Sequence, residues 1–154
     1  MKTYFKELNT SGWSGKTIIL DIDGTLTTDG NLDFDPLVLK KVEEMSKANS
    51  VFLFSNKHLT DRDSKASEAL HVPLIKSSLK KPNKKVIDGL GDHLKKNFIV
   101  IGDKILIDGF FAKNIGAEFI MVERLTSKND SLKTKLIYLL DDIAGILKIK
   151  SMIN

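Results

Sequence analysis

The chain has no cysteine among its 154 residues and only three histidines. The first absence excludes a disulfide scaffold, a thiolate zinc site and a cysteine nucleophile. Three histidines without partners at ligand spacing do not make a metal cluster. No apolar run approaches the roughly 20 residues that span a bilayer, and Met1–Gly15 lacks the apolar core of a signal peptide. We therefore expect a cytoplasmic protein.

Arginine is also scarce. Arg62 and Arg124 are the only two, so lysines make up nearly all of the 24 basic residues. Because base readout and bidentate phosphate binding favour arginine, we expect no specific nucleic-acid binding. The lysines are concentrated in residues 76–96, where acidic residues are few. Such a run is typical of a solvated helix face, although it also provides a positive field for an anionic substrate.

The remaining composition is that of a globular protein, with 42% hydrophobic and 29% charged residues. This length predicts a single domain over residues 1–154. Short apolar runs rich in branched and aromatic residues are typical of strands buried on both faces of a parallel sheet. They lie at residues 17–20, 51–54, 72–75, 98–101 and 119–122. Amphipathic stretches between them predict helices, so we expect a three-layer, Rossmann-like α/β fold with a mostly parallel, five-stranded sheet.

One helical stretch is expected to open at Pro36, and others at about residues 60–70, 82–94, 106–115 and 131–149. Asp35 followed by Pro36 predicts the N-cap and first residue of the first helix. We expect four of its apolar residues to face inward, namely Leu37, Leu39, Val42 and Met45. The last stretch has leucines and isoleucines along one side, and we expect this side to cover the sheet.

Polar residues follow the predicted strands where each strand ends. Asp21 and Asp23 follow the first strand, Ser55 the second and Asp103 the fourth, while Lys81 lies six residues beyond the third. In an open α/β sheet, ligands bind at the carboxyl ends of the strands. The sequence therefore predicts three carboxylates, a hydroxyl and an ammonium at one edge of the sheet.

In order and position these residues resemble the four motifs of the haloacid dehalogenase (HAD) superfamily of phosphatases. The segment Asp21–Thr27 (DIDGTLT) is similar to motif I, Ser55 to motif II and Lys81 to motif III. Gly102-Asp103, followed by Asp108, is similar to the acidic motif IV. The resemblance covers about residues 16–122 and implies a HAD-like fold and hydrolysis of phosphate monoesters through an aspartyl-phosphate intermediate.

The resemblance also implies a role for each carboxylate. Asp21 would be the nucleophile and a Mg²⁺ ligand, and Asp103 a second ligand. Asp23 would be the general acid and base, and its backbone carbonyl a third ligand, while Asp108 would orient a metal-bound water. The chemistry needs such a cation, because a carboxylate about 4 Å from a phosphate charge is repelled by roughly 4 kcal/mol at an effective dielectric of 20. Mg²⁺ suits hard oxygen ligands.

By the same resemblance, five residues would bind the phosphoryl group: Gly24, Thr25, Ser55, Asn56 and Lys81. Lys80 and Lys84 are alternatives to Lys81 in this lysine-rich segment. The Lys81–Pro82 step favours Lys81, because the motif III lysine of the family often opens a helix in this way.

Spacing predicts an open site. Residues 27–50 hold one turn and one helix, and residues 55–81 hold one helix and one strand, which leaves no room for a cap domain. The chain thus resembles the capless HAD subfamily III, and within it the YqeG-type phosphatases, relatives of the mitochondrial phosphatidylglycerophosphate phosphatases. It departs from that branch at Gly24, Lys104 and Ile107, where the branch usually has Asn, Gln and Thr.

These features predict a large or surface-bound anionic substrate, with at most peripheral membrane contact. One alternative is a sugar-acid phosphate phosphatase whose cap comes from a neighbouring subunit of a homo-oligomer. Another is a non-catalytic HAD-like or receiver-like signalling module. Receivers carry their phosphoacceptor after the third strand, and no aspartate follows residues 72–75 directly.

Overall fold

The structure is a computed structural model that describes residues 3–57, 61–93 and 97–147. Its centre is a parallel sheet of four strands, β1 (Thr17–Leu20), β2 (Ser50–Leu53), β3 (Phe98–Gly102) and β4 (Glu118–Met121), in the order β2-β1-β3-β4. Thr17 of β1 lies opposite both Ser50 and Phe98, so the two central strands end at the same level. Their carboxyl ends are therefore adjacent.

The prediction of a fifth strand at residues 72–75 is wrong. Leu74 forms only an isolated parallel bridge with Leu53, through hydrogen bonds from Leu53 N to Pro73 O and from Ile75 N to Leu53 O, each 2.9 Å long. On the N-terminal side, the next bond of the ladder would need the N–H of residue 73. Pro73 has none, so the pairing cannot extend in that direction.

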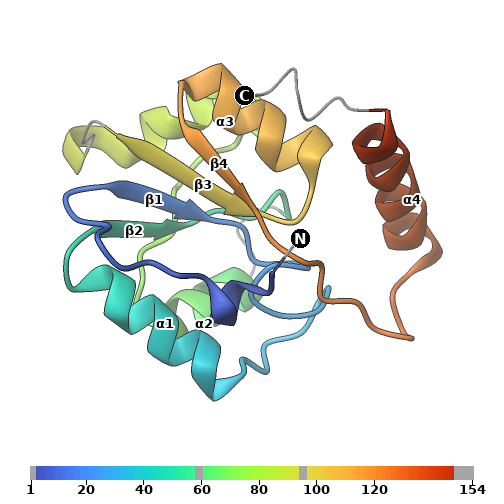
Figure 1. Ribbon diagram of the computed structural model, residues 1–154, viewed down its shortest axis with the longest axis horizontal. Coiled ribbons are helices and arrows are strands. Elements are labelled where there is room, and N and C mark those ends of the chain that lie inside the picture. Colours follow the sequence, from blue (N-terminus) through green and yellow to red (C-terminus); the bar gives the residue numbers. More distant parts are fainter. Residues whose placement is uncertain (1–2, 58–60, 94–96, 148–154) are drawn as a thin grey trace.

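Helices cover both faces of the sheet (Figure 1). One side carries α1 (Pro36–Ser46) and α2 (Asp61–Leu70), and the other carries the 3₁₀ helix η2 (Lys84–His93) and α3 (Phe110–Ile115). A short 3₁₀ helix, η1 (Phe5–Glu7), precedes the sheet, and a π-helical turn, η3 (Ile105–Gly109), leads into α3. The three-layer, parallel α/β arrangement agrees with the prediction from the sequence.

Two apolar cores follow from the alternation of side chains along the strands. Ile18 and Leu20 pack toward α1 and α2, whereas Ile19 and Val100 pack toward η2 and α3. All four are almost completely buried. Because both faces are covered, the strands read as continuous apolar runs, and the polar residues that follow them mark where the sheet ends.

The face that α1 buries differs from the prediction. Val42 and Met45 are buried as expected, but Leu37 and Leu39 are 56% and 36% exposed, and Val38 is buried between them. Residues 38, 42 and 45 form the inward stripe at helical spacing. Val38 thus takes the inward position expected for Leu37 and Leu39, and Asp35 caps the helix as predicted by accepting a hydrogen bond from Leu37 N.

The last helix, α4 (Leu132–Ile146), does not cover the sheet. It stands beyond the carboxyl ends of the strands, apart from the three layers (Figure 1). Its buried residues are Tyr138, Asp141 and Ala144, whereas most of its large apolar side chains are 45–85% exposed. We call these the α4 stripe: Leu132, Leu136, Leu139, Leu140, Ile143, Ile146 and Leu147.

Polar contacts explain this orientation of α4. The Asp141 carboxylate accepts a 2.8 Å hydrogen bond from Leu106 N and forms an ion pair with Arg124. These two contacts hold the polar side of α4 against η3. No helix in the described part of the chain is long and apolar enough to cross a membrane. Three expected helix limits, the start at Thr60 and the ends at Leu94 and Ile149, lie outside the described residues.

Candidate active site

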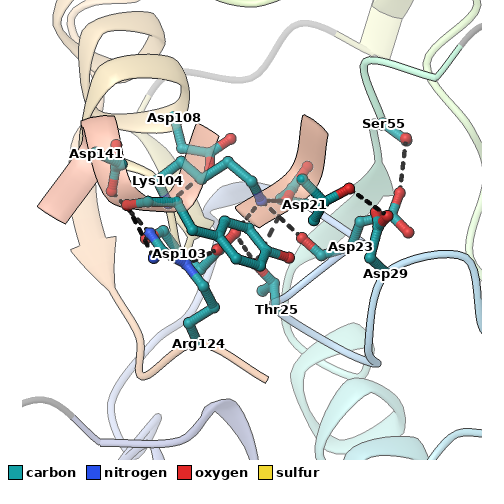
Figure 2. Close-up of polar contacts among 12 residues, drawn as sticks. Asp21, Asp23, Thr25, Asp29, Ser55, Asp103, Lys104, Asp108, Arg124 and Asp141 are labelled. Carbon is teal, nitrogen blue, oxygen red and sulfur yellow. Dashed lines mark hydrogen bonds and ion pairs between the residues drawn. The ribbon is translucent and has the colours of Figure 1, made fainter. Parts of the chain in front are cut away.

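Four loops bring the motif residues together at the carboxyl edge of the sheet (Figure 2). Asp21 directly follows β1, Asp103 directly follows β3, and Asp108 lies in η3. One carboxylate oxygen from each of these three lies within 4.8 Å of the others. All three carboxylates are buried, so their charges must be matched by nearby cations.

Lys81 provides one of these cations. Its ammonium lies 2.7 Å from Asp21 Oδ1 and 2.5 Å from Asp108 Oδ1, and it donates a 3.2 Å hydrogen bond to the Phe54 carbonyl. The side chain is only 1% exposed, whereas Lys80 and Lys84 lie on the surface. Of the three lysines considered from the sequence, Lys81 is the one whose ammonium lies among the site carboxylates.

The backbone of Lys81 is fixed by Asn56. The Asn56 side chain accepts a 2.8 Å hydrogen bond from Lys81 N and donates one of 3.0 Å to Lys81 O. The side chain of Asn56 therefore holds Lys81 in place, and only its backbone N–H is left as the predicted phosphate ligand.

Two glycines allow the carboxylates to approach one another. Gly24 has a φ of +85°, and a Cβ placed on it would lie 2.7 Å from Asp103 Oδ2. A Cβ on Gly102 would lie 2.3 Å from the Asp108 Cγ. The turn after β1 therefore requires glycine both for its backbone conformation and for space. Thr25 follows, with its Oγ1 between Asp21 and Asp103 at 3.5 and 3.4 Å.

Asp23 lies on the outer side of the cluster and is held by basic partners. Arg62 Nη2 lies 2.8 Å from Asp23 Oδ1, and Lys57 Nζ lies 3.4 Å from the same oxygen. Ser55 donates a 3.3 Å hydrogen bond to Asp23 Oδ2, and Gly30 N donates one of 2.9 Å to Oδ1. The predicted general acid and the predicted phosphate-binding serine are thus neighbours.

Arg124, just after β4, holds the far side of the cluster (Figure 2). Its Nε lies 2.7 Å from Asp103 Oδ2, and its Nη2 lies 2.9 Å from Asp141 Oδ2. Its guanidinium stacks over the Tyr138 ring at 4.2 Å from the centroid. Arg124 therefore links Asp103 to α4, and α4 to the site.

Lys104 lies at the centre of the remaining oxygens. Its ammonium donates a 2.8 Å hydrogen bond to the Asp23 carbonyl, contacts Asp103 Oδ1 and lies 3.6 Å from Asp21 Oδ2. Only 12% of its side chain is exposed. The groups that Lys104 contacts therefore follow the carboxyl ends of both central strands, β1 and β3.

The charges around Asp21 control its ionisation. Burial alone would raise its pKa, but Lys81 and Lys104 outweigh burial and hold the pKa of Asp21 below its usual value. Asp108 responds differently, because burial and the neighbouring Asp21 charge raise its pKa to about 7 against the attraction of Lys81. Lys81 keeps a raised pKa despite its burial, owing to Asp108 and Asp21. The site thus holds an ionised Asp21 beside a charged ammonium.

The carboxylates open into a cleft of about 510 Å³. Asp21, Asp23 and Lys104 line its floor, and Lys57 and Lys80 lie on its rim. One wall comes from α4, through Ser131, Lys133, Thr134, Ile137 and Tyr138. Thr134 also donates a 3.0 Å hydrogen bond to Asp29, in the loop after β1. A partial wall therefore comes from the C-terminal helix, which the spacing of the motifs does not reveal.

The donor set fits a hard divalent cation. Asp21 Oδ2, Asp103 Oδ1 and the Asp23 carbonyl are hard oxygen donors, and in this structure they already converge on a positive group, the Lys104 ammonium. Mg²⁺ takes such ligands and usually keeps several waters. The residues named from the sequence are therefore those that would hold the ion.

Sequence reasoning missed several residues of this site, among them Arg62, Lys104, Arg124 and Asp141. The two arginines carried a signal, since they are the only two in the chain and each pairs with a motif aspartate. Lys104 directly follows Asp103 in the sequence, but as a departure from the related branch it gives no indication of a place in the site. Asp141 carried no signal, because its role depends on how α4 packs.

The chain is similar to a known protein family and to a solved structure. The family model described as mitochondrial PGP phosphatase matches residues 5–125, which include all the motif residues and end before α4. A crystal structure of an uncharacterized protein from Listeria monocytogenes serotype 4b is similar, with a TM-score of 0.57 and 14% sequence identity. That likeness covers 86% of this chain and 98% of the other, and it supports the fold alone. Among curated protein sequences, none matches significantly.

Proposed function

The chain belongs to the mitochondrial PGP phosphatase family, whose members are HAD-type phosphomonoester hydrolases, and from that premise we propose that Asp21 is its nucleophile and Mg²⁺ its cofactor. The observation that carries the proposal is the Asp21 carboxylate itself. It lies at the end of β1 in the floor of the cleft, ionised and flanked by Lys81 and Lys104. An ionised carboxylate at an open cleft is equipped to attack phosphorus.

In the proposed reaction, an Asp21 oxygen forms a bond to phosphorus while the bond from phosphorus to the substrate oxygen breaks. Asp23 donates a proton to the departing oxygen, and the product alcohol leaves. Asp23 then takes a proton from a water that attacks the aspartyl-phosphate, which releases inorganic phosphate and restores Asp21. Arg62 and Ser55 position the Asp23 carboxylate in the floor of the cleft.

The cations of the site lower the barrier to this attack. When bound, Mg²⁺ would offset the repulsion between Asp21 and the phosphate dianion, held by Asp21, Asp103 and the Asp23 carbonyl. Lys81 stabilises the negative charge of Asp21 through a 2.7 Å contact with Oδ1, the oxygen that is not the proposed metal ligand. Asp108 holds Lys81 in that position through its own 2.5 Å ion pair, so we assign it a positioning role.

We propose a lipid phosphate monoester at an anionic surface as substrate, with phosphatidylglycerophosphate as the leading candidate. The cleft combines lysines on its rim with Ile107, Ile137 and Tyr138 on its lining, which suits a phosphate joined to an apolar body. The exposed α4 stripe adds apolar surface beside the cleft. Lys133 and Lys135 flank the stripe on opposite sides of the helix, at about 100° per residue, as in helices that lie on anionic membranes.

The test is kcat/KM for phosphatidylglycerophosphate in mixed micelles, against a panel of small sugar and nucleotide phosphates, at low and high salt with Mg²⁺. We expect the lipid to be preferred and the preference to weaken as salt screens the lysines. Preference for a small metabolite with no salt dependence would favour the alternative, a sugar-acid phosphatase with a cap supplied by another subunit. Binding without turnover of any substrate would identify a non-catalytic module.

A further inference from the structure

The ammonium of Lys104 occupies the point where the three oxygens proposed to bind Mg²⁺ converge (Figure 2). The oxygens are the Asp23 carbonyl, Asp103 Oδ1 and Asp21 Oδ2. An ammonium and a metal ion are both positive and cannot share this position. One must therefore leave before the other can enter.

The second oxygen of each carboxylate is held by a different cation. Asp21 Oδ1 pairs with Lys81, and Asp103 Oδ2 pairs with Arg124, both at 2.7 Å. Lys81 and Arg124 are each fixed by additional carboxylates outside the proposed ligand set. Among the described residues, in contrast, Lys104 forms ion pairs only with the two proposed ligand carboxylates. Of these three cations, Lys104 is the one that can leave without breaking a pair outside the metal site.

Lys104 also has space into which it can move. Its side chain lines the cleft, and its ammonium lies 5.5 Å from the centre of the Tyr138 ring, on the α4 wall. The buried cluster contains Lys81, Lys104 and Arg124 together with four acids, Asp21, Asp103, Asp108 and Asp141. A divalent ion would add two positive charges beside Lys104, and a phosphate dianion in the cleft would attract the displaced ammonium.

We propose that Lys104 is a tethered counter-cation that holds the ligand oxygens together in the metal-free enzyme. When Mg²⁺ binds, its ammonium swings into the cleft, where it meets the phosphate of the substrate. Lys104 thereby keeps the site assembled without metal and lowers its apparent affinity for Mg²⁺. This inference rests on the proposed function, because it concerns the same metal site.

The first experiment uses the wild-type chain. Surface lysines are acetylated with an amine-reactive ester, with and without saturating Mg²⁺, and the modified positions are quantified by peptide mass spectrometry. We expect Mg²⁺ to increase labelling of Lys104 several-fold, because the displaced ammonium becomes accessible. Labelling of Lys133, which lies on the same cleft without an ion pair to the acids in the described structure, should not change. Unchanged or reduced labelling of Lys104 would overturn the proposal.

The second experiment measures Mg²⁺ binding by calorimetry, together with thermal unfolding in EDTA. For Lys104→Gln we expect at least about tenfold tighter Mg²⁺ binding, since a competing unit charge is removed from the ion's position. We also expect a lower unfolding temperature in EDTA that Mg²⁺ restores. Lys133→Gln is the matched control, because it removes the same charge from the cleft without vacating the ion's position.

The outcomes separate this inference from the proposed function. If Mg²⁺ binds and supports hydrolysis but Lys104→Gln leaves its affinity unchanged, the inference fails and the proposed function stands. If neither the wild type nor Lys104→Gln binds Mg²⁺, the proposed metal site itself is wrong. If Lys104→Gln folds only with Mg²⁺ present, the proposal is supported directly.

Discussion

Replacing Lys81 by methionine tests the central ion pairs of the site. The substitution keeps most of the side-chain volume and removes the ammonium that bridges Asp21 and Asp108. Asp21 keeps Lys104 at 3.6 Å, but Asp108 loses its 2.5 Å ion pair and is fully buried. Removing one partner from a buried pair typically costs about 3–5 kcal/mol, because the remaining charge has no compensation. We expect Lys81→Met to lose about that much stability at pH 8.

The loss should depend on pH in a defined direction. Burial and the charge of Asp21 already raise the pKa of Asp108 to about 7, and removing Lys81 raises it further. A carboxyl whose folded-state pKa is raised contributes stability at low pH and loses it as pH rises through that value. The difference between Lys81→Met and the wild type should therefore shrink as pH falls from 8 to 5, since protonation of Asp108 removes the unpaired charge.

Urea unfolding followed by fluorescence measures this effect, because Trp13 is the only tryptophan and packs against the core. The control is the double variant Lys81→Met/Asp108→Asn, which removes both charges of the pair. It should recover at least about half of the lost stability, because an amide costs less to bury than an unpaired carboxylate. A loss below about 1 kcal/mol for the single variant, or no recovery in the double variant, would refute the reasoning.

Three further predictions concern activity. Asp21→Asn should leave the fold intact and abolish hydrolysis of an aryl phosphate, and a folded variant that keeps more than about a tenth of wild-type kcat would remove Asp21 from its role. EDTA should abolish activity, and Asp103→Asn should weaken apparent Mg²⁺ affinity in a metal titration; full activity in chelator would contradict the mechanism. Replacing the exposed Leu136 and Leu140 by glutamine should lower the rate on anionic vesicles while the rate on an aryl phosphate stays unchanged, and equal effects on both substrates would exclude a surface role for the α4 stripe.

The strands and the acids that follow them could be predicted because both depend on local sequence. A strand buried on both faces must be continuously apolar, so the first carboxylate after Leu20 or Ile101 marks the edge of the sheet. Parallel pairing then places those carboxylates side by side. The prediction of a fifth strand was wrong partly for an equally local reason. Pro73 has no N–H to donate, and a count of apolar residues does not take this into account.

The position of α4 could not be predicted from its own pattern. A stripe of leucines favours burial against a sheet, but the two faces of this sheet are already covered by other helices. The helix is held instead by Asp141, whose carboxylate meets Leu106 N and Arg124. Arg124 and Leu106 lie 17 and 35 positions from Asp141 along the chain. Only the folded chain brings them together, so the exposed stripe is a consequence of tertiary contacts.

The same argument applies to the cations of the site. Each motif aspartate is a local feature of a strand end, but burying it requires a positive partner. Lys81, Arg62 and Arg124 lie 21–60 residues along the chain from the motif carboxylates they meet. The sequence shows which charges must be compensated without showing what compensates them. Lys104 is the exception, because it adjoins Asp103 in the chain and lies on the proposed ligand oxygens. Lys104 is therefore placed where a metal ion can displace it. The cations from distant segments, Lys81, Arg62 and Arg124, instead stabilise the fold whether or not metal is bound.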